Sequence, residues 1–174
     1  MWWRGSWLSG VGRRPSPSWF DSCCVVDRPL ASISAVLISL LAGAMLFLRI
    51  VLLPFWRGAP PAEFRTWFAT HAGRIRALML PLGAASATAS VGATAARLVN
   101  GEDVRASAVA AVGAVGVVGI TVTVNEPANR EFASEELSDD ETARLLARWA
   151  RWHDVRVVLG LIAAAAAVRA LDDR

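Results

Sequence analysis

Hydrophobic and polar positions alternate along this chain in long blocks and not in short periods. Three blocks of twenty residues, 29–48, 77–96 and 106–125, contain no charged residue. A helix of that length rises about 30 Å, which matches the thickness of the hydrocarbon core of a bilayer. A soluble domain of 174 residues cannot bury three such helices. The pattern therefore predicts a polytopic membrane protein.

The residues that flank these blocks predict four membrane spans. Pro54, with two aromatic residues after it, ends the first span at the membrane interface. The last apolar stretch ends at Leu171 and is only just long enough to cross, with Arg169 snorkelling to the interface. Four spans also allow every apolar face to pack against another. The predicted spans are 31–53, 77–97, 106–125 and 155–171.

Residues 1–28 differ in composition from the rest of the chain. They contain four tryptophans, four arginines and a Pro-Ser-Pro stretch, and no apolar core of a signal peptide precedes Pro29. We expect a disordered or loosely surface-bound tail over 1–28 and a transmembrane domain over 29–174. Cys23 and Cys24 lie in the tail without a C-x-x-C motif, which argues against dithiol redox chemistry.

An aromatic stripe after Pro60 and Pro61 predicts a short amphipathic helix between the first two spans. Apolar and ring-bearing residues recur there at helical spacing, while charged residues lie off the stripe. Such a helix lies at the membrane interface or caps a bundle. The stripe consists of Phe64, Trp67, Phe68, His71 and Ile75. The expected fold is all-α, an integral membrane four-helix bundle with this interfacial helix between its first two spans.

Small residues predict packing faces on the second and third spans. In lipid, helices associate through close van der Waals contact, so small side chains favour helix–helix interfaces. We expect these faces to hold the bundle together and to offer a surface for a homo-oligomer, with a substrate path along the glycines as the alternative. The second span carries Ala84, Thr88, Gly92 and Ala96 at every fourth position, and the third carries Gly113, Gly116 and Gly119.

Polar and aromatic residues gather on one side of the predicted bundle. With four spans, the connections 54–76 and 125–156 lie on the same side of the membrane. They contain both histidines of the chain, His71 and His153. Ligand sites tend to form between the helices of a bundle, so we expect a site at this mouth.

Each member of this cluster also has a purely structural interpretation. Trp149, His153 and Arg156 share one face of the last helix at i, i+4 and i+7. They equally suit an aromatic belt, a hydrogen-bonded surface histidine and an anchoring cation. The Asn-x-Pro-x-Asn segment at 125–129 is typical of a helix stop, because proline ends the hydrogen-bond ladder. Their common location on one side favours the functional interpretation.

Composition limits the chemistry of such a site. Zinc needs three or four ligands, whereas the chain offers two histidines and scattered carboxylates without ligand spacing. No serine neighbours a histidine in a triad-like motif. We therefore expect no metal and no cofactor, with a bis-histidine haem as an open alternative that an absorbance spectrum decides. The net charge of +3 comes from arginines at helix ends and loops, which indicates the lipid bilayer and not nucleic acid as partner.

Two segments of the chain resemble a known family. The third span closes with TVTVNEPANREF, and the last helix contains ARWARWHDVRVVLG. Together with the Phe/Trp loop after the first span, they are similar to the anthrone-oxygenase-like membrane proteins, a group mostly catalogued as a domain of unknown function. The resemblance covers roughly residues 30 to 171. Its most specific positions are Asn125, Pro127, Asn129, Trp149, His153 and Arg156.

The resemblance also implies a reaction. Characterised fungal members of the family are associated with oxidising an anthrone to an anthraquinone without a conventional cofactor. That chemistry suits a general base near a phenolic substrate, and His153 is the base candidate. Asn129 and Arg156 are expected to orient or stabilise an enolate-like anion. The candidate catalytic set is His153, Arg156, Asn129 and Asn125, and the candidate substrate-binding residues are Trp149, His71 and Trp67.

Three functions stay open for this multi-pass protein of the cell membrane. The first is a small oxidoreductase that acts on an apolar aromatic compound, and the second is a non-enzymatic bundle that binds lipid or a partner helix. The third is a small transporter, although Arg49 is a poor substitute for an ionisable group in the middle of a span. The sequence decides neither whether the protein is an enzyme nor which side faces the cytoplasm, because arginines are similarly frequent on both sides.

Overall fold

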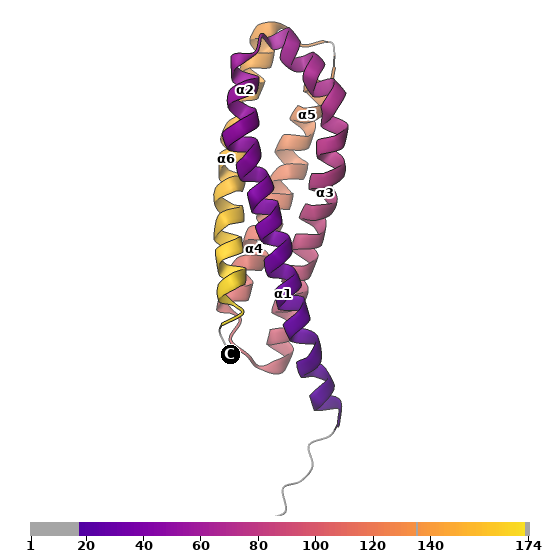
Figure 1. The fold of residues 1–174 in the computed structure, drawn as a ribbon, viewed down its shortest axis with the longest axis vertical. Coiled ribbons are helices and arrows are strands. Elements are labelled where there is room, and N and C mark those ends of the chain that lie inside the picture. The colour runs from indigo at the N-terminus through magenta and orange to yellow at the C-terminus, as the bar shows by residue number, and fades with distance from the viewer. Residues whose placement is uncertain (1–17, 135, 173–174) are drawn as a thin grey trace, which may run out of the picture.

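Every regular element that the structure describes is a helix, and the expected all-α four-helix bundle is confirmed. The computed structural model describes residues 18–134 and 136–172, with side chains from residue 28 onward. Four helical rods run side by side, alternately up and down (Figure 1). The first rod consists of α1 (Ser18–Phe47), η1 (Leu48–Leu52) and α2 (Leu53–Gly58), and the second is α3 (Pro61–Asn100). The third consists of α4 (Arg105–Ile120), η2 (Thr121–Asn125) and α5 (Glu126–Phe132), and the fourth is α6 (Asp139–Arg169).

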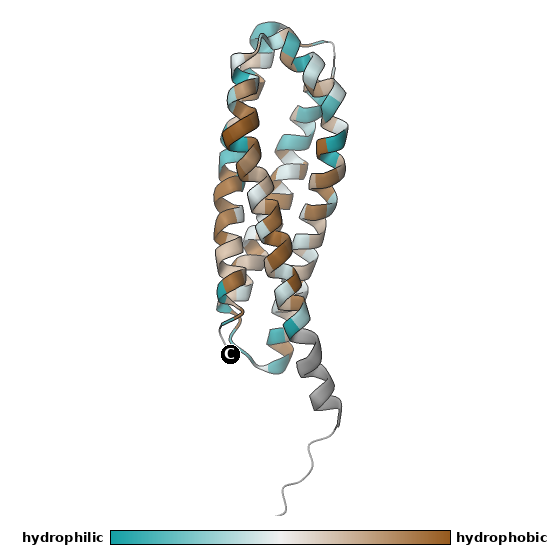
Figure 2. Cartoon of the chain, in the orientation of Figure 1, coloured by the Kyte–Doolittle hydropathy of each residue, from teal (hydrophilic) through white to brown (hydrophobic). Residues whose placement is uncertain are grey.

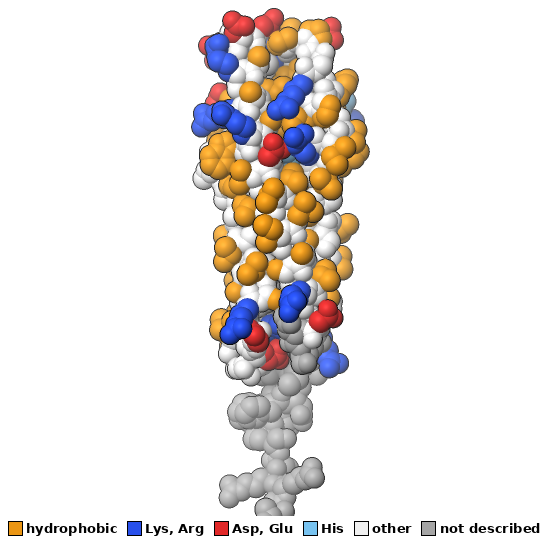
Figure 3. All heavy atoms as spheres, turned by 90° about the vertical axis from the view of Figure 1, so that its left-hand side faces the viewer, with side chains coloured by type: hydrophobic (Ala, Val, Ile, Leu, Met, Phe, Trp, Pro, Cys, Tyr) orange, Lys and Arg blue, Asp and Glu red, His pale blue; other side chains and the backbone are white. Residues whose placement is uncertain are grey.

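Three rods are long and apolar enough to cross a membrane, namely Arg28–Gly58, Pro61–Val99 and Arg105–Phe132. Figure 2 shows hydrophobic residues along the middle of the rods and hydrophilic residues at both ends. On the face drawn in Figure 3, hydrophobic side chains form a central band between two charged ends. The predicted fourth span, 155–171, is not among the three, because charged residues fill the first half of α6. The chain is therefore a membrane protein, and its described residues contain three candidate spans where four were expected.

The first rod is longer than the span predicted at 31–53. α1 begins at Ser18, so the last part of the predicted tail is helical. Residues 1–17 and the side chains of the two cysteines lie outside the described part of the chain. At its other end the rod continues past Pro54 as far as Gly58.

Pro54 and Pro127 were expected to end helices, but the helices continue past them. Two π-helical turns explain why. Proline has no N–H for the carbonyl four residues before it, and its ring crowds that carbonyl. Pro54 closely follows η1 and Pro127 closely follows η2, and in each case the wider π turn accommodates the missing bond. The helix then resumes as α2 or α5. The 125–129 segment is therefore not a helix stop.

The stretch predicted as a separate amphipathic helix is the first part of α3. This helix runs without a break for 40 residues, so the aromatic stripe continues directly into the second span. Phe64 and Phe68 on the stripe are buried and cap the bundle. The helix stops at Gly101, whose φ of 71° lies in the left-handed region that favours glycine.

Glycines of α4 form a close contact with α6. A Cβ atom on Gly113 would lie 2.8 Å from the Cβ atom of Ala163, and one on Gly116 would lie 3.5 Å from Leu159. The predicted packing face is confirmed at these two positions, where small residues let the backbones approach. A Cβ atom on Gly119 would have no neighbour within 4 Å, so this glycine takes no part in the contact.

The predicted packing stripe of α3 lies on the wrong face. Ala84 is exposed, and a Cβ atom on Gly92 would have no neighbour within 4 Å. The buried face carries Ser86 and Ser90 instead, and the Ser90 hydroxyl lies 2.8 Å from the hydroxyl of Ser34 on α1. Small residues occur on nearly every face of this helix, so their spacing alone cannot identify the packed one.

The two connections that were expected on one side of the bundle do lie at the same end (Figure 1). Arg65 of α3 donates hydrogen bonds to Asp139 (3.0 Å) and to Thr142 (2.7 Å) of α6. Ser138 and Glu141 form the predicted capping box at the start of α6. This end therefore unites the two segments in which the sequence places a site.

Candidate functional site

A layer of packed aromatic rings closes the connection end of the bundle. Trp56 of α2 packs edge-on against Phe68 of α3 and Trp149 of α6, with ring centroids 5.8 and 5.6 Å apart. Behind them, the rings of Phe64 and Phe132 pack against each other with centroids 5.0 Å apart. All five rings are buried, and their tilted and edge-to-face geometries are the favourable ones for aromatic pairs. We call these five residues the aromatic layer.

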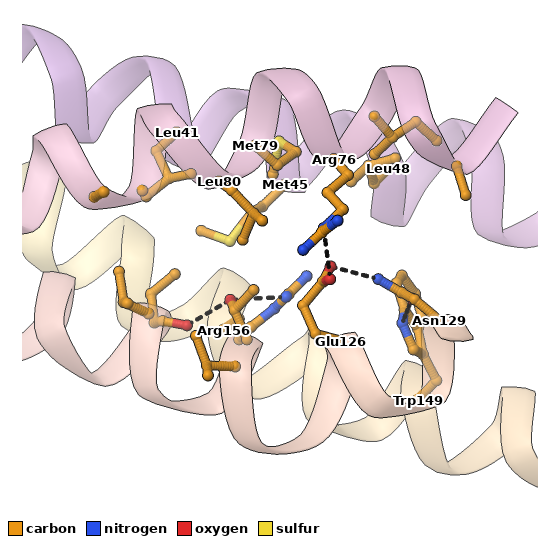
Figure 4. A pocket seen from close by; sticks show the side chains of 18 of the residues that line it. Leu41, Met45, Leu48, Arg76, Met79, Leu80, Glu126, Asn129, Trp149 and Arg156 are labelled. Carbon is orange, nitrogen blue, oxygen red and sulfur yellow. Dashed lines mark hydrogen bonds and ion pairs between the residues drawn. The ribbon is translucent and has the colours of Figure 1, made fainter. Parts of the chain in front are cut away.

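A cavity of about 260 Å³ lies next to the aromatic layer, between α3 and the third rod (Figure 4). Small-molecule sites typically have volumes of about 300–1,000 Å³, and this cavity lies close to the lower end of that range. Apolar side chains of α1, η1, α3 and α4 form most of its wall, including Leu41, Met45, Leu48, Ile75, Met79, Leu80, Val117 and Val118. The polar side chains that interrupt this wall are Arg76, Thr121, Glu126, Asn129 and Arg156.

Four of the lining residues form one chain of polar contacts. Nε of Arg76 lies 3.0 Å from Oε2 of Glu126, and Nδ2 of Asn129 donates to Oε1 of the same carboxylate at 3.0 Å. Nε1 of Trp149 donates to Oδ1 of Asn129 at 2.9 Å. Figure 4 shows the two contacts of the carboxylate as dashed lines. Asn129 thus uses both ends of its amide to orient a carboxylate and an indole.

Arg156 brings a positive charge to the apolar wall of the cavity. Its side chain is buried, Nη1 donates to Oγ1 of Thr121 at 3.0 Å, and Nη2 donates to Nδ1 of His153 at 2.8 Å. Its guanidinium carbon also lies 5.9 Å from the ring centroid of Trp149. No carboxylate of the described residues lies within 4.0 Å of the guanidinium. A buried cation with only neutral direct partners is costly, and it favours an anionic or strongly electron-rich ligand atom.

His153 supports Arg156 from behind. Its ring is fully buried, stacks on Trp149 with centroids 4.8 Å apart, and does not line the cavity. Because Nδ1 accepts from Arg156, Nε2 carries the proton and donates to the carbonyl oxygen of Met45 at 3.0 Å. Both nitrogens are engaged in these bonds. The geometry therefore gives His153 a positioning role and leaves neither nitrogen free to take a substrate proton or to bind a haem iron.

The structure brings only part of the predicted site together. Asn129, Trp149 and Arg156 line the cavity. Asn125 is buried beside it in the π turn, without a hydrogen-bond partner for its amide. Like His153, the remaining residues His71 and Trp67 do not line the cavity, and their rings stack on each other with centroids 4.6 Å apart.

Two charged lining residues were not among the predicted site residues. Arg76 and Glu126 end the second and third charge-free blocks on the same side of the bundle. That shared position is the signal that could have paired them. Arg49, the candidate for a transporter, is paired elsewhere, since its guanidinium binds the carboxylate of Asp154 on α6. No group of three or more His, Cys, Asp or Glu side chains in the described ranges is arranged to hold a metal ion.

A comparison with protein families identifies the family of the chain. A family model described as Anthrone oxygenase matches residues 64–166. Searches among curated proteins and among solved structures gave no significant match. The matched region covers more than half of the chain and holds every polar residue that lines the cavity. The chain therefore belongs to the anthrone oxygenase family.

Proposed function

We propose that the protein is an oxygenase of the cell membrane that oxidises an apolar, enolisable aromatic ketone with O2. The observation that carries this proposal is Arg156, a buried cation that faces an apolar cavity without a carboxylate in direct contact. The family description, anthrone oxygenase, supplies the reaction class. A bundle that only stored a lipid chain would gain nothing from such a charge, since acyl chains offer it no anion at that depth.

The reaction balances with O2 alone. An anthrone carries a CH2 group opposite its carbonyl in the central ring. Loss of one CH2 proton gives an aromatic enolate, which reacts with O2. The CH2 carbon becomes a second carbonyl, one oxygen atom enters the product, and the other leaves as water with the two hydrogens of the CH2 group. The four electrons lost by carbon are those gained by O2, so the stoichiometry requires no further reductant.

The residues around the cavity take distinct roles in this scheme. Arg156 stabilises the enolate oxygen, the position where negative charge develops. Thr121 and His153 hold the guanidinium in place, and Trp149 adds its ring to the wall of the substrate cavity. Glu126 takes the CH2 proton in place of His153, because it is the carboxylate on the cavity wall. Asn129 orients Glu126 and Trp149.

The fourth rod crosses the membrane together with the other three in this proposal. α6 packs along α1 and α4, and the residues it buries include Ala163 and Ala167 in its apolar half. The chain then passes the bilayer four times, with the start of α1 and the end of α6 on one side. Arg97 anchors the far end, because its buried guanidinium donates to the carbonyl oxygen of Ala170 at 2.8 Å.

A turnover assay tests the proposal. Protein in lipid nanodiscs is mixed with anthrone in air-saturated buffer, and anthraquinone formation and O2 uptake are followed, with protein-free nanodiscs as the blank for spontaneous oxidation. We expect one O2 per anthraquinone and a loss of about 100-fold or more in Arg156→Gln. Arg151→Gln, an exposed position on the same helix, should retain the wild-type rate. Wild-type protein no faster than the blank, or an unchanged rate in Arg156→Gln, would overturn the proposal.

A further inference from the structure

The cavity is closed toward the aqueous end of the bundle. Its roof consists of Trp56, Phe68 and Trp149 from the aromatic layer, which are 2%, 3% and 4% exposed. Phe64 and Phe132 pack against the outer side of this roof and are equally buried. A ligand that arrived from water would have to part five interlocked rings.

The cavity is open on one flank instead. Its lining residues from α1 and α6 are all buried, Met45 and Arg156 among them. The exposed lining residues are Arg76 and Ala84 on α3 and Val122 on η2, and the last is 54% exposed. These three residues mark a mouth between α3 and η2.

The mouth lies at the depth of the lipid chains. Ala84 and Val122 are inside the charge-free blocks 77–96 and 106–125. Arg76 and Glu126, which end these blocks, pair across the edge of the mouth nearest the aromatic layer. The hydrocarbon core of a bilayer solvates such blocks, whereas charged pairs belong near the headgroups. The opening therefore faces lipid tails and not water.

We infer that the cavity is loaded sideways from the bilayer, through the opening between α3 and η2. Its ligand is a flat, apolar molecule dissolved in the membrane that brings an oxygen acceptor to Arg156. Entry passes Gly83 on α3 and Val118 on α4, which face each other at the wall. A Cβ atom on Gly83 would lie 3.6 Å from Cγ2 of Val118, an ordinary contact, so alanine fits there while a larger side chain obstructs the passage.

Binding kinetics test this route without requiring turnover. The probe is 9,10-anthraquinone, which is added to wild-type protein in nanodiscs and followed by stopped-flow quenching of tryptophan fluorescence. Gly83→Leu and Val122→Phe should slow association and dissociation together, by about tenfold, because an obstructed passage affects both directions. Val122 is exposed, so its substitution tests the route even where Gly83→Leu does not fold.

Two control variants distinguish the mouth from the roof. Gly83→Ala adds a methyl group in ordinary contact and should leave both rates unchanged. Phe64→Ala thins the roof and should also leave them unchanged. Three results would each overturn the inference. They are wild-type rates in both obstructed variants, faster exchange in Phe64→Ala, and no binding of anthraquinone to the wild type. A protein that takes up anthraquinone through this opening but does not oxidise anthrone would keep this inference and lose the proposed function.

Discussion

Nε of Arg76 lies 3.0 Å from Oε2 of Glu126, so the charged residues that end two charge-free blocks pair with each other. The contact joins α3 to α5 at the edge of the cavity mouth and marks the depth at which the two rods meet. Asn129 extends the contact by donating to the other carboxylate oxygen. One pair of residues thus connects the hydropathy pattern, the bundle register and the candidate site.

This pair should stabilise the bundle only modestly. The Arg76 side chain is 63% exposed, so solvent screens its attraction to Glu126. A double-mutant cycle with Arg76→Gln and Glu126→Gln should give a coupling of about 0.5–1 kcal/mol in the free energy of unfolding. Steric-trap unfolding in bicelles measures it. A coupling indistinguishable from zero would show that the contact does not hold the rods together.

Two alanine substitutions in α4 should have opposite effects on stability. Gly113→Ala forces a Cβ atom to within 2.8 Å of Ala163 and 3.2 Å of a backbone oxygen, so it should destabilise the protein by about 1–3 kcal/mol. Gly119→Ala meets nothing and should stabilise it by about 0.5–1 kcal/mol, because alanine loses less backbone freedom. Thermal unfolding of the two variants in the same detergent measures both effects. Equal melting temperatures would refute the tight α4–α6 contact.

Much of the fold follows from the sequence, because long charge-free blocks have few alternatives to helices in lipid. The capping box at Ser138 is equally local and was predicted correctly. The two π turns were not predicted, because proline signals a lost hydrogen bond but not how the chain absorbs it. The packed face of α3 was also missed, since the small residues on that helix leave several faces equivalent.

The sequence indicated where the candidate site residues gather, and it indicated less well which of them line the cavity. Trp149, His153 and Arg156 share a helix face in any helix with this spacing, and the structure brings them together. The rotation of α6 against its neighbours decides which of the three residues reaches the cavity. This rotation cannot be read from the sequence. His71 lies at the same end of the bundle as these residues, but its ring stacks on Trp67 and does not line the cavity.

Substitution of His153 separates a positioning residue from a base. Its two nitrogens bind Met45 and Arg156, so His153→Gln should slow turnover by about 10- to 100-fold through a misplaced guanidinium. The loss should stay smaller than in Arg156→Gln. The pH–rate profile of His153→Gln should also keep the shape of the wild-type profile. A variant whose profile has lost one ionisation would restore His153 as the base.

The capping box should make the start of α6 sensitive to acid. Hydrogen bonds from Ser138 hold the pKa of Glu141 below its ordinary value of 4.5. A lowered pKa in the folded state means that stabilisation is complete above the ordinary value and is lost as the pH falls through the folded-state value. The melting temperature of the wild type should therefore fall more steeply on acidification below pH 4.5 than that of Glu141→Gln. Parallel curves would contradict this.

A titration decides whether Arg156 stabilises an aromatic oxyanion inside the cavity. The probe is 2-hydroxyanthraquinone, whose ionised form absorbs at longer wavelength, titrated with base in nanodiscs that contain wild-type protein, Arg156→Gln or no protein. We expect a lower pKa of the bound hydroxyl in the wild type than in protein-free nanodiscs, and a loss of this lowering in Arg156→Gln, because the cation favours the charged form. Equal pKa values for the probe in the wild type and in Arg156→Gln would contradict it.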